Sequence, residues 1–180
     1  MNDPHALLQF WFSPDVAADW FRQNPALDDQ IRQRYLPLYE SARSGQLARW
    51  EMHAEGALAL VIVLDQFPRN MFRGDAHAFA ADEQAREVAA RAIERGYDQQ
   101  LSPIQRSFMY LPYMHSESLA DQKRSLALYD ALGNPLNLDF ARKHHSIIAR
   151  FGRFPQRNAA LDRINNTNEA AFLEIPGNYF

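Results

Sequence analysis

Two short segments of the sequence place arginine and asparagine around a proline directly after an apolar stretch. Residues 63–72 read VLDQFPRNMF, and residues 151–158 read FGRFPQRN. Arginine is a bidentate donor to carboxylates and phosphates, and asparagine both donates and accepts hydrogen bonds. The two segments therefore predict recognition of an oxyanion or an amide. The candidate ligand-binding residues in these segments, with Arg73 directly after the first, are Asp65, Gln66, Arg69, Asn70, Arg73, Arg153, Arg157 and Asn158.

A third polar segment, YLPYMHSESLADQ at residues 110–122, offers acid–base chemistry. His115 and Glu117 suit a proton-transfer pair, because a carboxylate orients an imidazole and raises its pKa. Gln122 and His144 fall on the apolar faces of predicted helices, where a polar side chain needs partners. We therefore name His115 and Glu117 as catalytic candidates, and we add Gln122 and His144 to the ligand-binding candidates.

The same side chains also have a purely structural interpretation. Asp65 directly follows the apolar run ALALVIVL at residues 57–64. Its carboxylate is therefore expected to be buried and to need Arg69 or Arg73 as a partner. Pro68 predicts that the helix breaks and restarts at this point. Helix caps and a buried ion pair would then explain the polar residues without any ligand, and the sequence leaves both interpretations open.

Other kinds of site are excluded by what the sequence lacks. There are no cysteines, which excludes disulfides, thiol chemistry and cysteine-ligated metals. There is no H-E-x-x-H motif or local chelating pair, so we predict no metal site. There is no Gly-rich phosphate loop, nucleophile elbow or dinucleotide fingerprint, so we predict no cofactor.

Charge and hydropathy narrow the expected partners. The 180 residues have a formal net charge of −3, which argues against a nucleic-acid binder or a binder of anionic membranes. No apolar run approaches the ~20 residues of a membrane span, and the N-terminus lacks signal-peptide features. We expect a cytoplasmic protein that binds a small anionic ligand, an acidic peptide or a protein partner. The oligomeric state stays open.

Helical periodicity dominates the elements that must position these side chains. Residues 82–96 carry an apolar stripe of 3.6-residue period. Residues 54–66 are apolar on nearly every side, which predicts a central helix surrounded by others. Pro37 predicts a kink or break in its helix, and Pro112 predicts the end of another. The expected fold is all-α, one domain over residues 1–180, built as a helical array or bundle of about eight to ten helices.

Capping signals mark the ends of several predicted helices. Residues 102–111 begin with an N-cap serine and a proline at N1, residues 118–133 run from a serine to a glycine, and Gly152 ends the helix that carries Phe151. Asn166 and Glu169 have the spacing of a capping box. Gly152 thus places the second Phe-Pro-Arg-Asn-like turn immediately after a helix end. The break predicted at Pro68 places the first turn at a helix end in the same way.

Four segments together resemble the bacterial domain-of-unknown-function family numbered 924. They read GALALVIVLDQFPRNMFRG, AFAADEQA, FMYLPYMHSESLADQ and HHSIIARFGRFPQRNAAL, and FWF at residues 10–12 and LARWE at residues 47–51 also fit. The resemblance covers essentially the whole chain. It implies an all-helical fold with tetratricopeptide-like packing and no established activity. The family motif matches the candidate residues named above, together with Ser116 and Pro155.

The chain departs from the family pattern at a few positions. His145 and Ser146 stand where the family usually has Arg-Asp, which removes an acidic partner beside His144. Gln156 replaces a usual histidine, which argues against a general chemical role for that position. Asp162 replaces a usual glycine.

Three hypotheses about function follow. The first, which we prefer, is a binding module whose cleft accepts a small anionic ligand or an acidic peptide. The second is an enzyme that uses His115 and Glu117 on a substrate bearing a carboxylate or phosphate. The third is a helical interaction scaffold whose polar motifs only cap helices. The first two predict that both Phe-Pro-Arg-Asn-like turns converge with His115 in one concavity.

Overall fold

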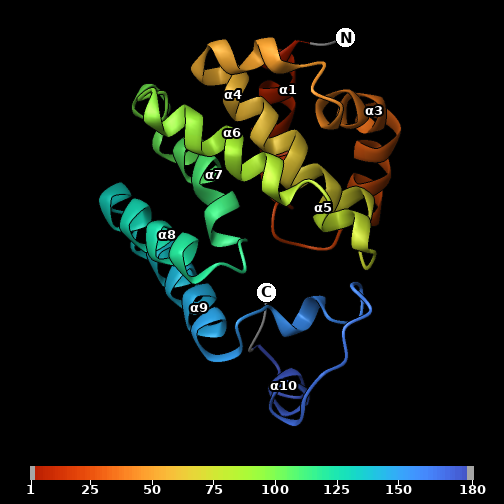
Figure 1. The fold of residues 1–180 in the computed structure, drawn as a ribbon. Helices are drawn as coiled ribbons and strands as arrows, with labels where there is room; N and C mark the ends of the chain where they lie inside the picture. Colours follow the sequence, from red (N-terminus) through yellow and green to blue (C-terminus); the bar gives the residue numbers. More distant parts are fainter. Residues whose placement is uncertain (1–2, 178–180) are drawn as a thin grey trace. The chain divides into compact units, whose positions relative to one another are not determined.

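The computed structural model describes residues 3–177, and every regular element in them is helical (Figure 1). This confirms the all-α prediction, whereas tetratricopeptide-like packing stays a prediction. The α-helices are α1 (Pro4–Trp11), α2 (Pro14–Ala17), α3 (Pro25–Arg43), α4 (Ala54–Val61), α5 (Phe67–Met71), α6 (Asp82–Glu94), α7 (Pro103–Met114), α8 (Leu119–Leu132), α9 (Pro135–Phe151) and α10 (Thr167–Leu173). Short 3₁₀ or π segments are η1 (Ala48–Met52), η2 (Ile62–Gln66), η3 (Ala76–Phe79), η4 (Asp98–Gln100) and η5 (Pro155–Arg157).

Contacts between Cα atoms divide the chain into two compact units. Unit 1 comprises the residues up to Arg73 together with His77–Pro112, and unit 2 comprises Gly74–Ala76 together with the residues from Tyr113 onward. The boundary falls within α7. That residues 1–180 form one domain stays a prediction.

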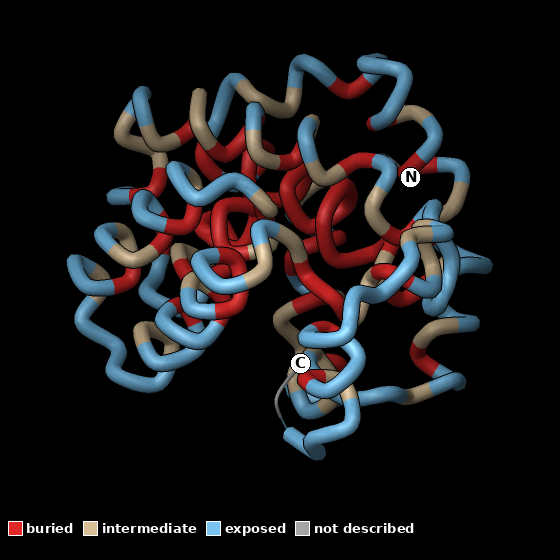
Figure 2. Tube along the Cα trace, turned by 60° about the horizontal axis from the view of Figure 1, so that its bottom comes forward, coloured by how far each residue is buried: buried red, intermediate tan, exposed pale blue. Residues whose placement is uncertain are grey.

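The predicted central helix forms the core of unit 1. Helix α4, the π-helical η2 and α5 follow one another without a gap, and residues 56–68 are all buried (Figure 2). Helices α1, α3 and α6 pack around this segment (Figure 1). Trp11 and Phe67 meet edge to face at 5.6 Å, which joins α1 to the central helix. A helix that is apolar all round is buried all round, as the sequence predicted.

The helix continues through Pro68, which corrects the predicted break. Gln66 and Phe67 keep helical dihedral angles, and the Phe67 N–H donates to the carbonyl of Ile62, five residues back. A proline in an α-helix clashes with the carbonyl four residues before it. The wider π turn therefore accommodates Pro68 without ending the helix.

The predicted helix end at Pro112 is also wrong, because Pro112 lies inside α7, which continues to Met114. Pro37 lies inside α3, which runs unbroken to Arg43, so the helix does not break there, and a kink at Pro37 stays a prediction. Packing of the apolar faces thus outweighs the backbone hydrogen bond that each proline removes.

Unit 2 is built on the antiparallel pair α8 and α9, which lie side by side (Figure 1). Gly133 ends α8 and Gly152 ends α9, both in the left-handed conformation that glycine adopts without a Cβ clash. A cluster of buried apolar side chains joins the end of α9, the second turn and α10: Ile147, Ile148, Phe154 and Phe172.

Replacing Gly56 with alanine is expected to lower the free energy of unfolding by about 2 kcal/mol. A Cβ at this position would lie 2.1 Å from the backbone oxygen of Trp50, so η1 or α4 must move. Chemical denaturation measures the loss. The exposed neighbour offers a matched control, since Glu55→Ala should change stability by less than about 0.5 kcal/mol. Wild-type stability in G56A would show that the two segments do not approach this closely.

Candidate functional site

The first polar turn ties the end of the central helix to α6. The fully buried Asp65 carboxylate accepts a hydrogen bond from Gln66 Nε2 at 2.6 Å and lies 3.3 Å from Arg69 Nη1. The two Nη atoms of Arg69 also donate to both oxygens of Asp82, at 2.9 and 3.0 Å. Burial works to lower the pKa of Arg69, but Asp65 and Asp82 outweigh it and raise that pKa. Arg69 is therefore a fixed cation between two carboxylates.

The next two candidate residues tie α5 to α3. Asn70 Nδ2 donates to Asp28 Oδ1 at 2.7 Å, and Arg73 forms a fork on the same carboxylate with two bonds of 2.9 Å. Asp28 lies in the first turn of α3, where a negative charge also favours the helix dipole. We call these residues, with Asp65, Gln66, Arg69 and Asp82, the first-turn network. It has the form that the structural interpretation predicted, a buried carboxylate paired with Arg69.

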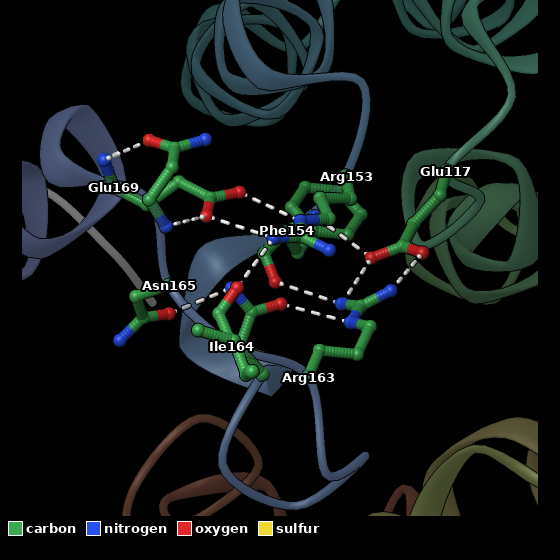
Figure 3. A network of polar contacts seen from close by, with 9 residues as sticks. Glu117, Arg153, Phe154, Arg163, Ile164, Asn165 and Glu169 are labelled. Carbon is green, nitrogen blue, oxygen red and sulfur yellow. Dashed lines mark hydrogen bonds and ion pairs between the residues drawn. The ribbon is translucent and has the colours of Figure 1, made fainter.

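The second polar turn forms a comparable network within unit 2 (Figure 3). Arg163 Nη1 and Nη2 donate to the two oxygens of Glu117, at 2.8 and 2.9 Å. The Phe154 N–H donates to Glu117 Oε1 at 2.7 Å. Glu117 thus fixes the backbone at the start of the second turn. It also binds Arg163, which lies 46 residues later in the sequence.

Arg153 anchors the same turn to α10 through Glu169. The guanidinium Nε and Nη2 of Arg153 donate to the fully buried Glu169 carboxylate at 2.6 and 2.8 Å. Glu169 Oε2 also accepts from the Asn166 N–H, and the Glu169 N–H donates to Asn166 Oδ1. The predicted capping box is therefore confirmed, with an arginine added to it.

Asn158 connects the two halves of this arrangement. Its Oδ1 accepts from Arg163 Nε at 2.8 Å, and its Nδ2 donates to Asn165 Oδ1 at 2.7 Å. The side chain is almost completely buried. We call Glu117, Arg153, Asn158, Arg163 and Glu169 the second-turn network.

The environment of Glu117 bears on its proposed acid–base role. Burial works to raise the pKa of Glu117, but the hydrogen bonds from Arg163 and from the Phe154 N–H outweigh it and lower that pKa. A carboxylate with a lowered pKa holds no proton to donate near neutral pH and is a weak base. This geometry suits Glu117 to holding the turn in place.

Four side chains of unit 2 form a second group, which we call the histidine cluster: His115, His144, Phe154 and Arg157. The His115 and His144 ring centres are 6.1 Å apart, and the His144 and Phe154 rings meet edge to face at 5.6 Å. The guanidinium carbon of Arg157 lies 4.6 Å from the centre of the Phe154 ring. His144 and Arg157 thus lie against the buried Phe154 ring, and His115 lies beside His144.

Backbone hydrogen bonds hold each member of the histidine cluster. His144 Nδ1 donates to the Phe140 carbonyl at 2.8 Å, which fixes the ring orientation. Arg157 Nη2 donates to the His115 carbonyl at 2.8 Å. The buried Gln122 amide donates to the carbonyls of Met114 and Ser116, on either side of His115, at 2.6 and 2.8 Å. Gln122 therefore positions His115.

The candidate residues fall into two sets. Unit 1 contains Asp65, Gln66, Arg69, Asn70 and Arg73, and unit 2 contains His115, Glu117, Gln122, His144, Arg153, Arg157 and Asn158. Within each unit the candidates lie close together. That the two turns converge in one concavity stays a prediction. Among residues 3–177, no group of three or more His, Asp or Glu side chains could hold a metal ion.

Several partners in these networks were not among the sequence candidates. Asp28 and Asp82 complete the first-turn network, and Arg163 and Glu169 complete the second-turn network. Glu169 had a sequence signal, because the capping-box spacing marked it. Arg163 is one of several basic residues at positions 142–163, which does not single it out, and no local pattern marked Asp28 or Asp82.

The comparisons with known proteins decide the family. The model of a bacterial protein family of unknown function, DUF924, matches residues 7–177. The chain belongs to the DUF924 family. A solved protein of unknown function from Agrobacterium tumefaciens, ATU0120, is 42% identical and has a TM-score of 0.89 over 95% of this chain and 96% of that one. No curated protein is detectably similar to the chain.

This DUF924 protein has no membrane-spanning helix in the part of the chain that the structure describes. None of the helices in residues 3–177 combines the length and the apolar character that a span requires.

Acid is expected to destabilise this DUF924 protein through Glu169. The hydrogen bonds from Arg153 lower the Glu169 pKa from its ordinary 4.5 to about 2. Because the folded pKa lies below the unfolded one, the stabilisation is fully present above 4.5 and is lost as the pH falls toward 2. Urea unfolding between about pH 7 and about pH 3 should show a steeper fall for wild type than for Glu169→Gln. Equal slopes would contradict the pairing.

Proposed function

We propose that the protein is a helical binding module that takes up a small anion, a phosphate or a carboxylate, at the histidine cluster. The observation that supports this best is the grouping of His144 and Arg157 on Phe154, with His115 beside His144. A guanidinium and two imidazoles offer directed N–H donors, which suit oxyanions. The flat Phe154 ring supplies an apolar wall beside them.

The arginines of unit 2 also support an anion at this place. Arg163 and Arg153 form bidentate forks on Glu117 and Glu169, respectively, which is the strongest form of such a contact. Arg157 donates to the His115 carbonyl, and that bond holds its guanidinium beside the Phe154 ring.

The groups of the histidine cluster are already held in place without a ligand, which favours binding to a preformed site over induced fit. Gln122 fixes the backbone around His115, Glu117 fixes the backbone of Phe154, and the Phe140 carbonyl fixes the His144 ring. A site whose groups are already ordered loses less entropy when a ligand arrives. The first-turn network, by contrast, is proposed to be structural, because its arginines already form forks on Asp82 and Asp28.

A thermal-melting screen tests this proposal. Phosphates, nucleotides and small carboxylates are added to the protein, and a ligand with dissociation constant Kd stabilises it by RT ln(1 + [L]/Kd). We expect at least one anion to raise the melting temperature of wild type, and the rise to disappear in Arg157→Gln and His115→Gln.

Arg150→Gln is the matched control for that screen, because Arg150 is exposed on α9 and its guanidinium lies over Phe151. Circular dichroism shows whether each variant keeps its helices. If no anion stabilises wild type, or if R157Q responds as wild type does, the proposal fails and the helical scaffold hypothesis is left.

A further inference from the structure

Unit 1 contains a cavity of about 120 Å³. None of the residues that line it belongs to the histidine cluster or to unit 2. Its apolar part is formed by Leu60 and Leu64 of the central helix and by Val88 of α6. Its polar part is formed by Glu51, Glu87 and Arg91. Small side chains, Ala42 and Ala48 among them, leave this space unfilled.

The polar part of the cavity has an excess of negative charge. Arg91 forms a fork on Glu51, with N–O distances of 2.7 and 2.9 Å. The same guanidinium lies 3.7 Å from Glu87 Oε2, and the Glu87 side chain is 59% exposed. Two carboxylates therefore face one guanidinium, and the more exposed carboxylate is held less closely.

The size of the cavity limits the apolar part of an occupant. An enclosed, dry cavity of ~150 Å³ takes up benzene, so this cavity of about 120 Å³, which is open to solvent beside the exposed Gly45, Ala48 and Glu87, suits an aliphatic body of at most about four carbons. Leu60, Leu64 and Val88 offer only methyl and methylene groups to that body. A cationic head would then meet Glu87 at the polar part of the cavity.

We propose that this cavity binds a small alkylammonium ion, with its aliphatic chain on Leu60, Leu64 and Val88 and its ammonium group beside Glu87. The inference does not depend on the proposed anion site, because the two use different residues in different units.

Titration with three probes of equal chain length tests the proposal by ¹H–¹³C methyl spectra. Butylammonium should cause saturable shifts at the methyl groups of Leu60, Leu64 and Val88. Butyrate should bind at least about fivefold more weakly, because its charge is repelled by the excess carboxylate, and butanol should fall between the two. Equal or tighter binding of butyrate, or no saturable shift with butylammonium, would overturn the proposal.

Two substitutions on α6 distinguish the effect of the Glu87 charge at the cavity from the effect of removing any negative charge on this helix. Glu87→Gln should bring the affinities for butylammonium and butyrate within about twofold of each other. Glu83→Gln is the matched control, since Glu83 lies one turn earlier on α6, is highly exposed and is not part of the cavity wall. If E83Q lowers the preference for butylammonium as much as E87Q does, the ammonium group does not sit beside Glu87 and the proposal is wrong.

Discussion

Replacing Asp65 with alanine is expected to lower the free energy of unfolding by about 3 kcal/mol or more. Asp65 is fully buried, and its carboxylate bonds to Gln66 and faces Arg69. Its removal leaves Arg69, whose side chain is only 20% exposed, with one buried carboxylate fewer. The Gln66 amide also loses its acceptor in a buried place.

Denaturant unfolding measures this loss, and two further variants show its cause. Asp65→Asn keeps a carbonyl oxygen of the same size but removes the charge, so it should cost less than Asp65→Ala. Glu83→Ala, on the exposed side of α6, should cost less than about 0.5 kcal/mol. An Asp65→Ala protein as stable as Glu83→Ala would show that the buried pair does not hold the central helix.

Replacing Glu169 with alanine is expected to cost about 3 kcal/mol and to release α10 locally. The substitution removes both the fork with Arg153 and the acceptor of the Asn166 N–H. Helix α10 has seven residues, too few for a stable isolated helix, so it depends on this cap and on Phe172.

Hydrogen exchange of the α10 amides is the direct readout for Glu169→Ala. Exchange of residues 167–173 should become much faster, while the amides of α4 in unit 1 keep their protection. Glu169→Gln retains a hydrogen-bond acceptor and should fall between wild type and Glu169→Ala. Unchanged protection of α10 in Glu169→Ala would mean that packing of Phe172 alone holds the helix.

Much of the fold follows from local patterns in the sequence. The apolar stripe at residues 82–96 became α6, and the run at residues 54–66 became the buried central helix. Rules about single residues were less reliable. Proline was expected to break the helix at Pro68, to end it at Pro112, and to kink or break it at Pro37. All three helices continue through the proline, through packing of α3 and α7 and through the π turn before Pro68.

The candidate site could be predicted only in part from the sequence, because many of its residues pair with residues that are distant along the chain. The buried state of Asp65 and its pairing with Arg69 could be inferred from an apolar run ending in a carboxylate. Nothing local marked Asp28 as the partner of Arg73, 45 residues away, or Arg163 as the partner of Glu117. Long-range pairs depend on how helices pack, which charge patterning along one helix does not reveal.

Calorimetric titration of inorganic phosphate and of succinate is the most direct test of anion binding at the histidine cluster. At least one of them should bind wild type. Arg157→Gln should weaken the affinity about tenfold or more, the effect of losing one charged hydrogen bond, whereas Arg150→Gln should leave the affinity within about twofold. Failure of both anions to bind, or equal affinity in wild type and R157Q, would contradict anion binding at the histidine cluster.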